Sequence, residues 1–207
     1  MAKVYYADVP PPARPLTGPQ SFGIELQPPK WIVKNMYRFN NPEHSAHCIS
    51  ALRILVDGMP REDIDAVVEA CGVEAIISAM QRHTDDTGVQ VMGSGTLSII
   101  ASSNDDARLR VLEAGGLLEV GAAVQRCRQH TDGDGEDIDG HIVCNWSFCA
   151  ECLREIAGKR TVWKNRAHIE AAIERGVEAS LFDKAKEGQG RRPVPTYSSR
   201  NHSSASA

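Results

Sequence analysis

The motif Val67-Val68-Glu69-Ala70-Cys71-Gly72-Val73 recurs 44 positions later as Val111-Leu112-Glu113-Ala114-Gly115-Gly116-Leu117. The same shift brings Gln81-Arg82 onto Gln125-Arg126. A third, more distant copy reads Ala-Ile-Glu-Arg-Gly-Val over residues 172–177. A period of roughly 40 to 47 residues is typical of helical solenoids, in which each unit buries its apolar face against its neighbours. The sequence therefore predicts stacked helical repeats.

The apolar residues between Asn41 and Gly188 recur at intervals of three and four, as Ile49, Leu52 and Leu55 illustrate. This spacing is the helical period, and the alternation that is typical of strands is absent. Each unit is predicted to contain a long, a short and a middle helix. The expected helices span residues 43–58, 62–71, 73–83, 87–102, 105–114, 116–129, 141–158, 162–175 and 177–186. The predicted fold class is all-α.

The two Glu-Ala-x-Gly motifs, at residues 69–72 and 113–116, each precede an apolar helix and resemble the armadillo repeat. The resemblance covers about 145 of the 207 residues. It implies about three armadillo-like repeats stacked into a right-handed helical solenoid, whose third helices line a concave groove. Members of the family chiefly bind other proteins in that groove, so the resemblance implies a protein-binding module.

The resemblance also assigns groove residues to this chain. In importin-alpha-like members a groove helix carries Trp and, four residues later, Asn. The matching positions here hold other residues, so capture of a nuclear-localisation peptide is not expected. The candidate partner-binding groove is apolar, mildly acidic and suited to a helix or an apolar segment. If the assumed register is off by one residue, some of the same positions are core residues between repeats. The candidate residues are His47, Ser50, Ile54, Met92, Gly95, Ile99, Phe148, Glu151 and Glu155.

The two ends of the chain differ from its middle. Seven of the 11 prolines lie in the first 29 residues, which predicts an extended Pro-rich arm over residues 1–35. This arm either docks on the body or a partner, or is a disordered leader. Residues 36–188 form the predicted repeat domain, with an acidic insertion loop at 131–140. Residues 189–207 are Ser-rich, basic and without acidic residues, which predicts a flexible tail.

The charge balance is slightly acidic, with 23 Lys and Arg against 27 Asp and Glu. A nucleic-acid binder needs a basic surface, so no nucleic-acid partner is expected. No apolar run approaches the roughly 20 residues that span a bilayer, and direct membrane insertion is not expected. The six cysteines fall mostly in helical apolar patterns and are expected to be reduced. This predicts an intracellular protein, cytoplasmic first, with organellar, cytoskeletal or ciliary assemblies left open.

Reactive side chains gather at Cys144, Cys149 and Cys152, which makes a metal-binding or thiol-redox protein the alternative function. On a helix, Cys144 and Cys152 are about 12 Å apart, too far to share one zinc ion. The acidic loop begins like a calcium loop but has Asp137 where Gly is needed. No catalytic motif is present, so no catalytic residue, metal or cofactor is assigned. The predicted function is a non-enzymatic interaction module or scaffold, an accessory subunit of a larger assembly.

Overall fold

The structure is a computed structural model that describes residues 27–57, 61–130, 146–158 and 163–182 of the 207-residue chain. Within those ranges it is all-helical and has no strand. The α-helices and the single 3-10 helix of the described part are α1 (Pro29–Met36), α2 (Pro42–Val56), α3 (Arg61–Glu69), α4 (Gly72–Arg82), α5 (Thr87–Ser103), α6 (Asp105–Glu113), α7 (Gly116–His130), α8 (Trp146–Ala157), α9 (Trp163–Glu174) and η3 (Ala179–Phe182). None of these helices combines the length and apolarity needed to cross a membrane.

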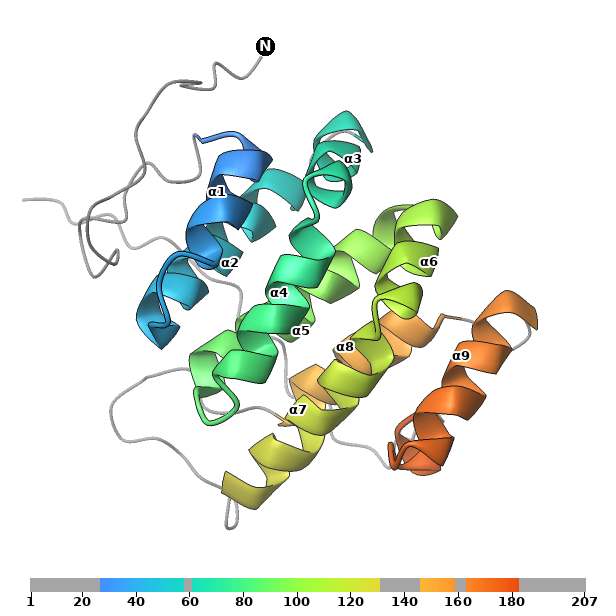
Figure 1. Ribbon diagram of the computed structural model, residues 1–207. Helices are drawn as coiled ribbons and strands as arrows, with labels where there is room; N and C mark the ends of the chain where they lie inside the picture. Colours follow the sequence, from blue (N-terminus) through green and yellow to red (C-terminus); the bar gives the residue numbers. More distant parts are fainter. Residues whose placement is uncertain (1–26, 58–60, 131–145, 159–162, 183–207) are drawn as a thin grey trace, which may run out of the picture.

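The helices lie in three rows, as Figure 1 shows. Helices α2, α5 and α8 pack side by side in chain order, and so do α1, α4 and α7. Helices α3, α6 and α9 form the third row. The core lies where these rows meet, and all three rows contribute to its largest fully buried side chains, the row of α3, α6 and α9 only through Ile169: Ile32, Met36, Ile49, Leu52, Leu55, Ile76, Met80, Leu97, Ile100, Leu153, Ile156 and Ile169.

Side-chain caps fix where several helices begin. The side-chain oxygens of Asn41, Asp86 and Asn104 each accept a hydrogen bond, at 2.8 Å, from the backbone N–H three residues later. Such a cap satisfies one of the backbone donors that the first helical turn leaves unpaired, which stabilises a helix by about 1 kcal/mol. Helices α2, α5 and α6 therefore start where the sequence places a capping residue.

The turn between the short and middle helices is built in the same way in two units. Cys71 and Gly115 both adopt positive φ, at 61° and 87°. The next residues, Gly72 and Gly116, pack so tightly that an added Cβ would lie 2.6 Å from Val67 Cγ1 or 2.5 Å from Val111 Cγ1, respectively. The 44-residue sequence repeat is thus matched by a repeated local structure.

Two sequence predictions need correction. Residues 29–36, most of them placed in an extended arm that ended at residue 35, form helix α1, and its Ile32 and Met36 are fully buried. Pro29 occupies a first-turn position, where the missing N–H costs no helical hydrogen bond, so the Pro-rich composition hid a helix start. In the described part of the helix expected over residues 177–186, residues 179–182 form the 3-10 helix η3 in place of an α-helix, and Leu181 and Phe182 are buried. Residues 1–26, the acidic loop at 131–140 and the tail at 189–207 lie outside the described residues.

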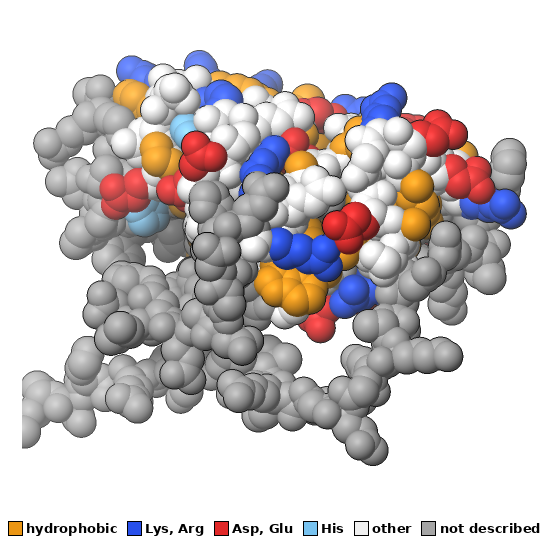
Figure 2. Space-filling model, turned by 90° about the horizontal axis from the view of Figure 1, so that it is seen from below, with side chains coloured by type: hydrophobic (Ala, Val, Ile, Leu, Met, Phe, Trp, Pro, Cys, Tyr) orange, Lys and Arg blue, Asp and Glu red, His pale blue; other side chains and the backbone are white. Residues whose placement is uncertain are grey.

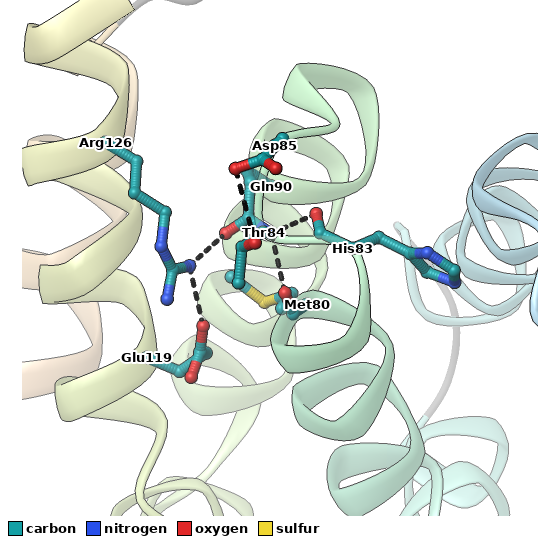
Figure 3. Close-up of polar contacts among 7 residues, drawn as sticks. All are labelled: Met80, His83, Thr84, Asp85, Gln90, Glu119 and Arg126. Atoms are coloured by element: carbon teal, nitrogen blue, oxygen red, sulfur yellow. Dashed lines mark hydrogen bonds and ion pairs between the residues drawn. The ribbon is translucent and has the colours of Figure 1, made fainter.

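A polar network joins α4, α5 and α7 (Figure 3). Gln90, only 1% exposed, donates from Nε2 to the carbonyl oxygens of Met80 (2.8 Å) and His83 (2.9 Å) at the end of α4. Arg126 of α7 donates from Nη1 to Gln90 Oε1 and to Glu119 Oε1, both at 2.9 Å. The network thereby satisfies carbonyl groups that the end of α4 leaves without helical partners.

Candidate functional site

The nine candidate groove residues all lie on α2, α5 and α8, the three helices of one row. Each helix contributes residues at positions i, i+3 and i+7, a spacing that places them along one side of a helix. Together with Arg53, which the structure adds, they are called here the α2/α5/α8 surface. The set is His47, Ser50, Arg53 and Ile54 of α2, Met92, Gly95 and Ile99 of α5, and Phe148, Glu151 and Glu155 of α8.

The α2/α5/α8 surface has an apolar middle. Ile54 is 52% exposed, which is high for a large aliphatic side chain. Met92, Ile99 and Phe148 are partly buried and pack against the core, so each shows part of its side chain. Adjacent apolar side chains that a partner can bury provide binding free energy, at roughly 25 cal/mol per Å² of apolar surface.

Gly95 lies beneath this surface. It is buried, and a Cβ added to it would lie 3.1 Å from Phe148 Cζ and 3.6 Å from Arg53 Nη1. The absence of a side chain at Gly95 therefore lets the Phe148 ring and the Arg53 guanidinium approach each other above α5. Sequence reasoning placed Gly95 in the groove but missed Arg53. The long Arg53 side chain extends from α2 over the neighbouring helix α5, which its position in the sequence does not indicate.

The charged groups of the α2/α5/α8 surface are unpaired within the described part of the chain. The side chains of Arg53, Glu151 and Glu155 form no hydrogen bond or ion pair there, whereas His47 Nε2 lies 3.7 Å from Glu43 Oε1. Other exposed charges of the described part do pair, as Arg128 does with Glu178 at 2.9 Å. Figure 2, which views the molecule from below Figure 1, shows exposed hydrophobic side chains bordered by both basic and acidic ones. A ligand of this surface can thus meet apolar groups, a cation and two carboxylates.

The cysteine cluster has a different character. Cys149 is fully buried and Cys152 is 4% exposed. Burial raises the pKa of Cys152 to about 12 and also raises that of Cys149. Thiols with such pKa values are neutral at pH 7, and the thiolate is the nucleophile and the metal ligand. Cys144, the third member, lies outside the described residues.

The other cysteines bear on redox state and metal binding. Cys48, Cys71, Cys149 and Cys152 are free. Cys127 is disulfide-bonded, so the expectation that all six are reduced is wrong at this position. A helical apolar pattern indicates that a thiol is buried, but it does not indicate whether another sulfur atom lies nearby. The sequence therefore did not reveal the disulfide at Cys127. Among the described residues, no group of three or more His, Cys, Asp or Glu side chains could hold a metal ion.

A second polar cluster joins α1, α2 and the end of α4. His44 donates from Nε2 to the Asn35 carbonyl oxygen at 3.0 Å, and a hydrogen bond of 3.1 Å joins Ser45 Oγ and His83 Nε2. Burial is the main cause that lowers the pKa of both histidines. Ser45 is fully buried, so no substrate can reach its hydroxyl despite the neighbouring imidazole. The His44–Asn35 hydrogen bond thus helps to hold α1 against α2, and the Ser45–His83 hydrogen bond joins α2 to the end of α4.

Comparison with known proteins found no matching family model, no matching curated protein and no matching solved structure.

Proposed function

We propose that this chain is a non-enzymatic protein-interaction module, acting as a scaffold or accessory subunit in a larger intracellular assembly. Its partners are other proteins, which bind on the α2/α5/α8 surface. One observation carries the proposal: three adjacent helices present apolar side chains together with charged groups that have no partner among the described residues. The combination suits protein binding because apolar contacts supply affinity and the charges select the partner and its orientation.

The proposed architecture is a right-handed solenoid of about three armadillo-like repeats. It is supported by the three rows of helices and by the equivalent turns at Cys71 and Gly115. Gly176, also at positive φ (101°), occupies the corresponding place after α9. Counted from its short helix, each repeat of such a stack runs α3, α4, α5 and then α6, α7, α8, so α5 and α8, with α2 before them, are the third helices and their common face is the concave one. Helix α1, which packs on α2 and α4, lies at the N-terminal end of the proposed stack.

The proposed ligand is a helical or extended protein segment. Its apolar side chains would contact Ile54, Met92 and Ile99, and its charged groups would pair with Arg53, Glu151 or Glu155. These contacts run across helices of one row, which is how a groove binds a linear segment. No catalytic step is assigned to the surface.

The experiment is affinity capture from native extract with the full chain and with Ile54→Glu. Ile54 is half-exposed, so the variant is expected to fold and to lose most of a specifically captured set of proteins. Ala167→Glu on α9 is the matched control, because it adds the same charge at an exposed position outside the surface. A captured set that is the same for wild type, Ile54→Glu and Ala167→Glu would refute the proposal.

A second pair of variants tests the middle of the surface. Ile99→Glu is expected to reduce capture, whereas Leu118→Glu on α7, equally half-buried against the core, is expected to retain it. Circular dichroism of each variant confirms that the helices are intact. If both variants lose capture to the same extent while staying folded, the assignment of binding to the α2/α5/α8 surface is wrong.

A further inference from the structure

We propose that the outward side of α1 binds an acidic protein segment that carries carboxylates at alternate positions of an extended chain. The surface consists of Lys30 and Lys34 of α1, Tyr37 and Arg38 in the turn after it, and Arg82 of α4; it is called here the α1 basic face. Helix α1 stands at the end of the row of α1, α4 and α7 (Figure 1). The inference therefore goes beyond the proposed function, which concerns the α2/α5/α8 surface.

The α1 basic face gathers positive charge on a protein with an excess of acids. Lys30, Lys34 and Arg38 are exposed, and α1 and the turn after it contain no Asp or Glu. None of these three side chains forms an ion pair within the described residues. Glu74 of the neighbouring helix α4 is paired instead with Arg110. The three cations are thus available to the carboxylates of a partner.

Arg82 and Tyr37 add a fixed cation and a fixed ring to this face. Arg82 donates from Nη2 to the Met36 carbonyl oxygen at 3.0 Å and from Nε to the Ser78 carbonyl oxygen at 3.3 Å. Its guanidinium carbon lies 5.7 Å from the centroid of the Tyr37 ring, and Tyr37 is 50% exposed. Because these contacts already hold both side chains, a ligand loses little binding free energy in ordering them.

Lys30 stands where the helix alone would favour an acid. It lies in the first turn of α1, which has no acidic residue. The N-terminal end of a helix carries a partial positive charge, so a cation there is unfavourable. Lys34, in the last turn, meets the negative end and stabilises the helix. A role in binding therefore explains Lys30, whereas a role in stabilising α1 does not.

The spacing of the cations matches an extended acidic segment. Lys30 and Lys34 are about 6 Å apart along the axis of α1. Arg38 follows four residues later, in a turn where its N–H donates to the Asn35 carbonyl oxygen at 3.0 Å. In an extended chain, side chains two residues apart lie on the same side and about 6.7 Å apart. Carboxylates at alternate positions can therefore pair with successive cations.

Two other kinds of anionic partner fit the α1 basic face less well. A nucleic acid is charged along its whole length, and outside this face it would meet a protein with a formal net charge of −4. A helix that binds an anionic membrane inserts apolar side chains, but α1 buries Ile32 and Met36 in the core. A short acidic protein segment requires only the face itself.

The test is fluorescence anisotropy with a labelled peptide of six Glu-Ser repeats, titrated with the full chain. We expect saturable binding that weakens at least about tenfold between about 50 and 300 mM NaCl, because salt screens exposed charges. A peptide of six Glu-Ser-Ser repeats has the same charge but places successive Glu on opposite sides, and should bind about threefold more weakly. No binding of the first peptide, or equal binding of both, would overturn the proposal.

A matched pair of arginine variants locates the binding. Arg38 and Arg175 are both exposed and form no ion pair within the described residues. Arg38→Glu is expected to lower the affinity for the Glu-Ser peptide about fivefold. Arg175→Glu makes the same charge change just after α9 and is expected to leave the affinity unchanged. Equal losses would show that the peptide responds only to net charge, and the α1 basic face would be the wrong site.

Lys30→Glu separates binding from folding. The affinity should fall about fivefold while Tm stays constant or rises, because the new acid lies at the N-terminal end of α1. A lower Tm with unchanged affinity would mean that Lys30 serves the fold, and would refute its role in binding.

Competing probes decide the class of ligand. Tighter binding of a labelled single-stranded oligonucleotide, or of phosphatidylserine vesicles, than of the Glu-Ser peptide would overturn the proposal. A dimer of the chain that Arg38→Glu dissociates would assign the face to a second copy instead. Ile54→Glu, on the α2/α5/α8 surface, should bind the peptide as the wild type does, so this proposal and the proposed function fail separately.

Discussion

Replacing Cys71 with glycine should stabilise the protein. Cys71 has φ 61° and ψ 34°, in the left-handed region. A non-glycine L-residue in this conformation costs roughly 1–2 kcal/mol. Glycine avoids that cost but loses about 0.5–1 kcal/mol through the greater freedom of its unfolded backbone. The Cys71 side chain is exposed, so its removal forfeits little buried surface. The expected net gain in the free energy of unfolding is about 0.5–1 kcal/mol.

The matched variant is the reverse change in the next unit, Gly115→Cys. Gly115 has φ 87°, and a Cβ there would meet nothing within 4 Å, so the backbone conformation alone sets the cost. This variant should lose about as much stability as Cys71→Gly gains. The two sites are 44 residues apart in equivalent turns, and the double variant should therefore lie near the wild type, since distant substitutions add.

Urea unfolding followed by circular dichroism at 222 nm measures these changes at a fixed redox potential. In thermal unfolding of the same variants, a gain of about 1 kcal/mol corresponds to a rise of roughly 2–4 °C in Tm for a chain of this size. A Cys71→Gly variant that is less stable than the wild type would show that the thiol contributes more than the backbone strain costs. The equivalence of the two turns would also be refuted if Gly115→Cys had no effect.

Three further changes have expected outcomes. Arg126→Met should lower the free energy of unfolding by about 2–3 kcal/mol, because it removes the partner of Gln90 Oε1 and of Glu119, which is only 7% exposed. Arg166→Met, in an exposed ion pair, should change the free energy of unfolding by less than about 0.5 kcal/mol. Equal effects of the two variants in urea unfolding would contradict the assigned network. The free energy of unfolding should fall as the pH drops from 7.5 through about 6.5 to 5.5. The reason is that the pKa values of His44 and His83 in the folded state lie below the unfolded value of 6.5, so the unfolded chain binds protons more tightly. A urea midpoint that stays constant over this pH range would refute this prediction. Iodoacetamide at pH 7.5 should label the exposed Cys71 well before Cys48 and Cys152, because burial raises the pKa of each of these two thiols to about 12. Equal labelling rates, measured by mass spectrometry, would contradict this prediction and favour the thiol-redox alternative.

The sequence predicted the helices of the first two units to within a few residues. The reason is physical: strong apolar periodicity, a capping residue such as Asn41 and a turn glycine such as Gly72 each act locally. The local signals misled at the ends. Pro29 indicated an extended arm although its place in the first helical turn is favourable, and the short η3 replaced a helix whose apolar pattern is weak.

The candidate site could be predicted only in part. The resemblance to the armadillo repeat placed nine residues on three helices that the structure brings into one row. It could not show that Gly95 lies beneath Phe148 or that Arg53 reaches over α5, since both depend on how neighbouring helices pack. The disulfide at Cys127 likewise depends on distances in space that no spacing in the sequence encodes.

The most direct measurement is hydrogen–deuterium exchange of the full chain, alone and bound to a protein that it captures. Binding on the α2/α5/α8 surface predicts slower exchange confined mainly to peptides from α2, α5 and α8. The row of α3, α6 and α9, on another side of the fold, should exchange at an unchanged rate and is the internal control. Protection of α3, α6 and α9 with α2, α5 and α8 unchanged would contradict the proposed function.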